Sequence, residues 1–264
     1  MRKLTSLLVA VGMTGFLLVL PAPAAAADCP PDSVRSGNLC IDKYEASVWE
    51  IAESNVVIKF IRAGRATLDM LLAAGAVQHG VSGADYGKNC PASGNGCVNF
   101  YAVSIPGVTP SANLTWFQAA AAARNSGKRL PTNAEWQVAA LGTPDPGTNQ
   151  SGIDDGAVDC NIGAVGYAVF TGSRSRCVSD VGAFDMVGNV WEWVADWTPR
   201  STLCISALFA ADGNCLAGAS VSDGPGALLR GGGYVDETGA GVFAVSGLSP
   251  VTFWSPDYGF RAAR

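Results

Sequence analysis

The segment 184–197, FDMVGNVWEWVADW, restricts the folds open to this chain more than any other. It places three tryptophans, two aspartates and one glutamate around a single Gly-Asn turn. The tryptophans carry a large apolar surface that has to be buried in a core. A bare carboxylate, in contrast, cannot be buried without a partner, because removing its charge from water costs too much. The acidic side chains must therefore stay in water or surround a cation.

Both interpretations of this segment remain open from the residues alone. The turn at Gly188-Asn189 would bring Asp185 and Glu192 to the same side. Carboxylates and turn carbonyls are ligands that suit a hard cation such as calcium. The segment therefore predicts either a calcium site or a surface hairpin with a solvated acidic rim.

Four further motifs occur with this segment, namely IDKYE at 41–45, KRLPTNAEW at 128–136, LRGGG at 229–233 and GFR at 259–261. Together the five resemble the sulfatase-modifying-factor superfamily, which includes the formylglycine-generating enzymes. The resemblance spans about residues 40–264. It implies an α+β fold of the formylglycine-generating-enzyme type, which is C-type-lectin-like, loop-rich and disulfide-stapled, with small antiparallel sheets and two main helices. It also implies that a first strand within 40–48 lies near the last one, within 259–263.

Residues 1–27 are typical of a secretory signal peptide. Arg2 and Lys3 precede the apolar run Leu7–Leu20, and a small-residue cleavage site lies at 25–27. The apolar run is short and interrupted, which argues against a membrane anchor, and no later segment is apolar for long enough to span a bilayer. We expect a secreted or periplasmic protein without a membrane span after cleavage. Its single domain would be 28–264, with 50–110 as a partly irregular insertion.

The net charge is −5, and cleavage after Ala27 would make the chain more acidic by removing two basic residues. This balance argues against nucleic acid and anionic membranes as partners. His79 is the only histidine, so sites that need several histidines are excluded. The surrounding residues have the composition of a loop, and we expect the His79 side chain to be solvated.

Eight cysteines in an exported chain predict disulfides. They fall into couples that are close in sequence, and neighbour pairing is our prediction among the 105 connectivities that eight cysteines allow. A zinc site is disfavoured, because the chain has no tight CxxC motif. The prediction pairs Cys29 with Cys40, Cys90 with Cys97, Cys160 with Cys177, and Cys204 with Cys215.

Three helices are predicted from their ends. Capping boxes at 115–118 and 132–135 open one helix that runs to about residue 125 and a second that ends before Gly142. A shorter helix at 67–74 would be capped by Thr67. Because Glu135 occupies the last position of a capping box, we interpret it as a helix cap and not as a general acid.

The superfamily resemblance implies two structural calcium sites. In the first, the side chain of Asn161 and the carbonyl of Ile162 would be ligands, although a plain disulfide-bounded loop is the alternative there. The second would use the carboxylates of Asp185 and Glu192 and the carbonyls of Gly188 and Val190. Calcium would hold the chain in place and take no part in chemistry.

The same resemblance places the chemistry of the formylglycine-generating enzymes on two cysteines that bind copper. Their positions align here with Asp236 and Gly241, and no cysteine follows Cys215. Gly233 replaces the serine of the preceding Gly-Gly-Ser element. Cuprous copper prefers soft sulfur ligands, which carboxylates do not replace. We therefore do not expect a copper cofactor or the oxidase activity.

The residues that remain at this position are typical of a binding surface, since they combine aromatic side chains with carboxylates. The alternative is that Phe253 and Trp254 belong to the core. The predicted ligand-binding residues are Val235, Asp236, Glu237, Thr238, Phe253, Trp254, Asp257 and Tyr258.

Three functional hypotheses follow. The first is a secreted, calcium-stabilised, non-catalytic protein that binds an unknown protein or glycan ligand. A variant of it is a receptor-binding protein diversified by a retroelement, since such proteins of similar fold vary in this C-terminal segment. The second is a sulfatase-modifying oxidoreductase or a related enzyme. The third is a structural component of the cell envelope.

Overall fold

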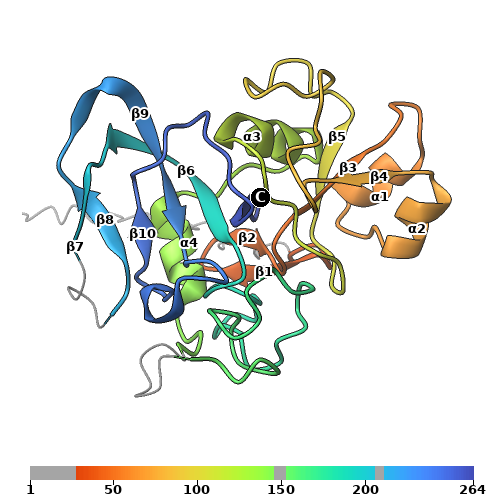
Figure 1. Ribbon diagram of the computed structural model, residues 1–264. Coiled ribbons are helices and arrows are strands. Elements are labelled where there is room, and N and C mark those ends of the chain that lie inside the picture. The colour runs from red at the N-terminus through yellow and green to blue at the C-terminus, as the bar shows by residue number, and fades with distance from the viewer. Residues whose placement is uncertain (1–27, 146–152, 206–210) are drawn as a thin grey trace, which may run out of the picture.

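The computed structural model describes residues 28–145, 153–205 and 211–264. The predicted signal peptide at 1–27 lies outside these residues. The described chain is α+β, as predicted, with short helices and strands joined by long loops (Figure 1). The helices are α1 (Val57–Arg62), α2 (Leu68–Ala73), α3 (Trp116–Asn125), α4 (Asn133–Ala140) and the 3-10 helix η2 (Glu237–Gly239). The strands are β1 (Ser33–Ser36), β2 (Leu39–Asp42), β3 (Ser47–Glu50), β4 (Val77–His79), β5 (Phe100–Val103), β6 (Trp191–Arg200), β7 (Leu203–Ile205), β8 (Asn214–Ala217), β9 (Ser220–Arg230), β10 (Val245–Ser246) and β11 (Tyr258–Phe260).

The described strands form a two-stranded, a three-stranded and a six-stranded sheet. The order is β1-β2 in the first, β4-β3-β5 in the second and β11-β6-β9-β10-β8-β7 in the third. The prediction of antiparallel sheets is wrong for two pairs, β11–β6 and β10–β8, which are parallel. In each pair the chain crosses over before the second strand, which allows both strands to run in one direction.

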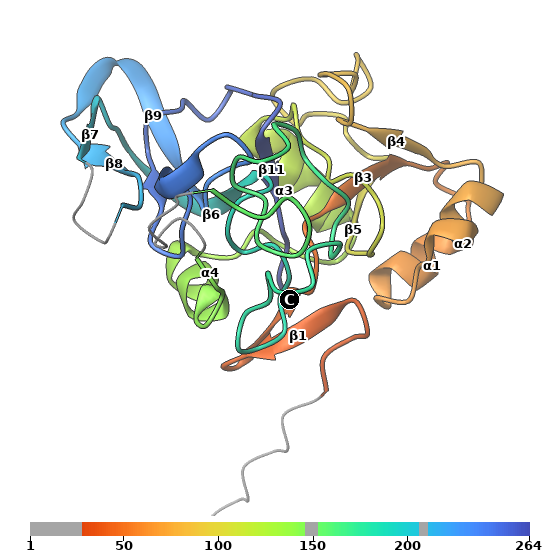
Figure 2. The same ribbon diagram turned by 60° about the horizontal axis from the view of Figure 1, so that its bottom comes forward.

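The start and the end of the described chain lie side by side, as predicted (Figures 1 and 2). The backbone N–H of Ala46 donates to the carbonyl of Phe260 at 2.8 Å, and that of Cys40 donates to the carbonyl of Arg264 at 3.1 Å. The last strand, β11, pairs with β6 at the same time. The C-terminal residues therefore join the first strands to the six-stranded sheet.

Both capping boxes are confirmed, in α3 by Thr115 and Gln118 and in α4 by Thr132 and Glu135. The short helix predicted at 67–74 is α2, and the Thr67 side chain accepts a hydrogen bond from the Met70 N–H. Helix α1 was not predicted, because its N-cap residue makes no side-chain cap that a sequence pattern could reveal. The two helices with the strongest sequence signals are thus the two main helices of the fold.

All four predicted disulfides are present, and none of the cysteines is free. The partners are separated by 7 to 17 positions in the sequence, so each bond closes a short loop. Cross-links of this kind stabilise a loop-rich fold by restricting the unfolded chain, and they are typical of proteins in oxidising compartments. The bonds join Cys29 to Cys40, Cys90 to Cys97, Cys160 to Cys177, and Cys204 to Cys215.

Two of these disulfides are completely enclosed by the protein. Cys90 and Cys97 belong to the main apolar cluster, and their bond closes the irregular loop before β5. Cys160 and Cys177 belong to a small separate cluster with Ile162, which is one of the predicted calcium ligands. The second of these bonds therefore fixes the chain directly beside the first predicted calcium site.

The range 50–110 contains α1, α2, β4 and β5 around a small apolar core, and its irregular part is the loop 80–99. The prediction that His79 is solvated is wrong. His79 ends β4, its Nε2 lies 3.0 Å from a carboxylate oxygen of Glu50, and its ring packs against Phe100. The flanking glycines have a loop composition that conceals this strand.

Within the described ranges, no helix has the length and apolar character needed to cross a bilayer. The main apolar cluster lies between α3 and strands of the six-stranded and three-stranded sheets. Trp193, from the central segment, is completely buried in this cluster. Trp191 and Trp193 therefore contribute to the core as expected, whereas Trp197 is 46% exposed. The carboxylates of the segment need a separate explanation.

Candidate functional site

The cation among the buried carboxylates is Arg261, which directly follows β11. Arg261 Nε lies 2.8 and 2.7 Å from the two carboxylate oxygens of Glu192, and Arg261 Nη2 lies 2.6 Å from one of them. The indole N–H of Trp136 donates to the same carboxylate at 2.5 Å. Arg261 Nη2 also donates to the carbonyl of Phe184 at 2.8 Å. Glu192 is thus both neutralised and hydrogen-bonded inside the protein.

Two further carboxyl groups are buried beside this ion pair. Asp185 accepts a hydrogen bond from the Gly172 N–H at 2.7 Å, and burial raises the pKa of Asp185 to about 7. Glu45 accepts hydrogen bonds from the Asn189 side chain at 2.5 Å and from the Val190 N–H at 3.1 Å. Burial, followed by the nearby charges of Asp185 and Glu192, raises the pKa of Glu45. The surroundings therefore disfavour three simultaneous charges.

The second predicted calcium site thus fits a metal poorly. Its four proposed ligands lie around one turn, but both oxygens of Glu192 are engaged by Arg261. The Val190 and Gly188 N–H groups fix the turn by donating to Glu45 and to the carbonyl of Gly231. Within the described chain, no group of three or more His, Cys, Asp or Glu side chains is placed to hold a metal.

The first predicted calcium site fits better. The Asn161 side chain is buried, and its Oδ1 has no hydrogen-bond partner. Its Nδ2 donates to the carbonyl of Tyr167 at 2.9 Å and to Asn189 Oδ1 at 3.1 Å, which fixes the orientation of the amide. Buried oxygens without a partner are costly, and a bound cation would satisfy this one. Ile162 follows directly, and its carbonyl accepts a hydrogen bond from the Glu237 N–H at 2.7 Å.

The two positions that align with the copper-binding cysteines have other roles here. Asp236 Oδ2 accepts hydrogen bonds from the Trp191 indole N–H and the Gly233 N–H, both at 2.7 Å. A Cβ on Gly241 would lie 2.2 Å from both carboxylate oxygens of Asp212, so the space for a side chain is already filled. Because every cysteine is in a disulfide, the residues present do not fit cuprous copper.

Asp236 lies in a group of acidic and aromatic side chains. A Cβ on Gly233 would lie 3.3 Å from Asp257 Cβ and 3.5 Å from Asp236 Oδ2, which places both aspartate side chains beside this glycine. Burial, together with the charge of Asp257, raises the pKa of Asp236. The Tyr258 hydroxyl lies 3.0 Å from Ser249 Oγ, and its ring packs edge-on against Trp193.

The predicted ligand-binding residues divide into two classes. Four are exposed, and the alternative that Phe253 and Trp254 belong to the core is wrong, since their side chains are 48% and 47% exposed. The other four are partly buried. The exposed residues are Val235, Glu237, Phe253 and Trp254, and the partly buried ones are Asp236, Thr238, Asp257 and Tyr258. The sequence interpretation did not assign Trp191, whose position in the WEW motif beside the turn was the available signal.

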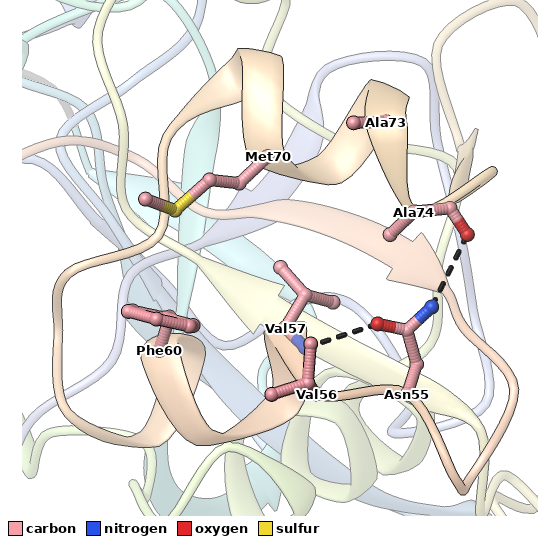
Figure 3. A pocket seen from close by; sticks show the side chains of 7 residues that line it. All are labelled: Asn55, Val56, Val57, Phe60, Met70, Ala73 and Ala74. Atoms are coloured by element: carbon pink, nitrogen blue, oxygen red, sulfur yellow. Dashed lines mark hydrogen bonds between the residues drawn. The ribbon is translucent and has the colours of Figure 1, made fainter.

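A separate apolar pocket of about 400 Å³ lies between α1 and α2 (Figure 3). Phe60 and Met70 face each other across it. The only polar side chain among its seven lining residues is Asn55, which is bonded to the Val57 N–H and the Ala74 carbonyl. The pocket therefore provides apolar contact without a free polar group to orient a ligand.

The fold and the site together define a C-type-lectin-like α+β protein of the formylglycine-generating-enzyme type. Residues 22–264 match the family model described as "Sulfatase-modifying factor enzyme 1-like domain", and the chain belongs to this family. At the two positions where the resemblance implies copper-binding cysteines, this chain has Asp236 and Gly241.

Formylglycine-generating enzymes are among the curated relatives. The enzyme of Thermomonospora curvata is 36% identical over 101 residues, which cover 33% of each protein. The enzyme of Streptomyces coelicolor is 31% identical over 140 residues, which cover 48% of this chain and 42% of the relative. The chain thus spans less than half the length of these relatives. Among solved structures, the Major Tropism Determinant P3c Variant matches 89% of this chain and 52% of its own, with 16% identity and a TM-score of 0.48.

Proposed function

We propose that this protein is an exported, non-catalytic binding protein built on the scaffold of the formylglycine-generating enzymes. One observation carries the proposal: the two thiol positions are Asp236, whose carboxylate is bonded to Trp191 and Gly233, and Gly241, whose side-chain space is filled by Asp212. The site has therefore been rebuilt around other interactions. The four disulfides support an oxidising destination such as the periplasm or the medium.

The ligand would contact the C-terminal surface, which we define as residues 235–238 and 253–258. Its exposed aromatic side chains, Phe253 and Trp254, provide apolar contact area, and Asp236 and Asp257 provide hydrogen-bond acceptors. Neither carboxylate forms an ion pair with a basic side chain in the described part of the chain. A protein or glycan that offers hydrogen-bond donors beside an apolar face would complement this surface.

Calcium would support the scaffold at Asn161 and Ile162. The unpartnered Asn161 Oδ1 favours this position, whereas the Arg261–Glu192 ion pair makes the second position unfavourable. The role of the ion would be to hold the loop after Cys160 against the turn at Gly188-Asn189, where the Asn189 N–H donates to the Asn161 carbonyl at 2.8 Å. Calcium would take no part in ligand chemistry.

The proposal is tested by screening the purified protein against a glycan array and against envelope extracts. We expect the screen to identify a ligand of the wild-type protein. A Phe170→Ala control should bind this ligand as the wild type does, because Phe170 is an exposed aromatic outside the C-terminal surface. The double variant Phe253→Ala/Trp254→Ala should lose at least about tenfold in affinity, as expected for buried aromatic anchors. A ligand that the double variant binds unchanged would contradict the proposed surface.

A second candidate is an enzyme, and the relatives named formylglycine-generating enzymes favour it. For this chain, oxidation of a cysteine peptide would need a metal centre different from the thiolate site. A structural envelope component is the third candidate. It predicts capture of protein partners by a surface other than residues 235–238 and 253–258, and no signal on the glycan array.

A further inference from the structure

The outer face of α3 separates two hollows on the protein surface. One has a volume of about 460 Å³ and the other about 510 Å³, which is the size range of small-ligand sites. Trp116, Ala120 and Arg124 line both hollows, because they are spaced four residues apart along the same face of the helix. We call this surface the α3 groove. Its other walls include Leu130, Thr132 and Ala195 on one side, and Ser93, Gly94 and Phe117 on the other.

Two aromatic rings of the α3 groove, those of Trp116 and Phe117, pack with the ring of Trp197 beside it, and we call the three rings the aromatic platform. The ring centroids of Trp116 and Trp197 are 5.2 Å apart, those of Trp116 and Phe117 are 5.4 Å apart, and all three rings pack edge-on. The Trp116 indole N–H donates to the Val194 carbonyl at 2.7 Å, which fixes its ring. The Trp197 side chain is nevertheless 46% exposed. The platform thus presents aromatic surface to solvent with little conformational freedom left to lose.

Arg124 is the uncompensated cation of the α3 groove. It is exposed, and it forms no ion pair with any described acidic residue. The other basic residues of the lining are neutralised: Arg129 lies 2.6 Å from a carboxylate oxygen of Glu135, and Lys128 pairs with Asp32 and Asp42. The acidic net charge of the chain does not attract an anion, so the preference has to come from the groove itself. A free guanidinium in the same hollow as Trp116 and Phe117 favours a ligand that combines an apolar face with an anionic group.

We propose that the α3 groove binds an acidic saccharide. A pyranose ring would lie with its C–H face on the aromatic platform, and its carboxylate or sulfate would accept paired hydrogen bonds from the planar guanidinium of Arg124. A peptide is less suitable, because the nearby main-chain and indole donors are already used. The Ala195 N–H donates to the Pro131 carbonyl at 2.7 Å, and the Trp116 indole donates to Val194.

The test is calorimetric titration of the full exported chain with three probes: a chondroitin sulfate tetrasaccharide, the neutral cellotetraose and tetraglutamate. We expect the sulfated, uronate-containing probe to bind. Arg124→Gln should weaken its binding by about tenfold or more, the loss expected for a charge-assisted bidentate contact. Trp197→Ala tests the platform, and circular dichroism establishes that both variants fold. Arg176→Gln is the charge-matched control, since Arg176 is exposed and lies outside the α3 groove, and it should bind within about twofold of wild type.

Several outcomes would overturn the proposal. Equal binding of cellotetraose would remove the role of Arg124, and binding that neither Arg124→Gln nor Trp197→Ala weakens would place the saccharide elsewhere. Tetraglutamate binding with the same affinity and the same sensitivity to Arg124→Gln would assign the groove to an acidic protein. If the sulfated probe did not bind at millimolar concentration, the proposed saccharide site would be rejected. The Phe253→Ala/Trp254→Ala variant should bind this probe normally, so failure of this proposal is distinguishable from failure at the C-terminal surface.

Discussion

Arg261 and Glu192 form a bidentate ion pair that is almost completely inaccessible to solvent, although 69 residues separate them in the chain. Glu192 lies on β6, and Arg261 directly follows β11, the strand paired with β6. The pair explains how the central segment can bury a carboxylate within an apolar core. It also joins the two motifs that contain these residues, FDMVGNVWEW and GFR.

Removing one partner of this pair should strongly destabilise the fold. Glu192→Gln removes the carboxylate that contacts the buried Arg261 guanidinium, and we expect a loss of about 3–5 kcal/mol in the free energy of unfolding. Urea unfolding with the disulfides intact measures this loss. Arg176→Gln removes two exposed ion pairs, with Asp155 and Asp159, and should cost at most about 1 kcal/mol. A Glu192→Gln variant as stable as this control would show that the buried pair does not hold the segment.

The close contact between Gly241 and Asp212 predicts an interaction between two substitutions. Gly241→Ala places a Cβ 2.2 Å from the Asp212 carboxylate oxygens and should cost roughly 1–3 kcal/mol through overpacking. Asp212→Ala removes that obstacle. In a double-mutant cycle, the double variant should therefore lose less free energy of unfolding than the two single variants together, by at least about 0.5 kcal/mol. Additive losses would mean that a side chain at 241 has room beside Asp212.

The stability that the N-terminal cap of α4 contributes to the fold should depend on pH. A hydrogen bond from Arg129 lowers the pKa of Glu135 from 4.5 to about 2 in the folded protein. A lowered carboxyl pKa stabilises the fold above the unfolded pKa, and this contribution is lost as the pH falls from about 5 through 2. Glu135→Gln keeps the capping geometry but loses the charge, so it should be less stable than wild type by roughly 0.5 kcal/mol at pH 7. Chemical unfolding at several pH values should show this difference closing in acid, and a difference that widens there would contradict the assignment.

Calcium should stabilise the protein through Asn161. At a calcium concentration a hundredfold above Kd, binding to the folded state contributes about 2.7 kcal/mol, so the Tm should rise on adding calcium and fall again with a chelator. Asn161→Ala should abolish this response, whereas Asn38→Ala, at an exposed position, should preserve it. The readout is the calcium-dependent change, because Asn161→Ala also loses hydrogen bonds to Tyr167 and Asn189. A Tm that calcium leaves unchanged in the wild-type protein would reject the site.

The features that the sequence predicted well are local. Each capping box is defined by residues three positions apart, and each disulfide, such as that between Cys90 and Cys97, joins neighbours that close a short loop. The interactions that it missed join distant residues. The contact between His79 and Glu50 depends on the register of β4 on β3, and the Arg261–Glu192 ion pair depends on the pairing of β11 with β6.

The candidate site was predicted in composition but not in geometry. The motif alignment placed Asp236 and Gly241 at the thiol positions, yet the sequence could not show that Trp191 holds the Asp236 carboxylate or that Asp212 fills the space at 241. Exposure of Phe253 and Trp254 follows from the turn after Pro250, where the Phe253 N–H donates to the Pro250 carbonyl at 2.9 Å. A hydrophobic pattern alone does not distinguish such a turn from a buried segment.

The central claim is that this scaffold lacks the thiol chemistry of the family's enzymes. It is tested most directly by incubating the purified protein with copper, in air, with a cysteine peptide derived from a sulfatase, and measuring aldehyde formation by mass spectrometry. The enzyme of Thermomonospora curvata serves as the positive control. We predict no aldehyde above the copper-only background and no copper retained after desalting. Conversion of the peptide cysteine to an aldehyde by this protein would contradict the claim.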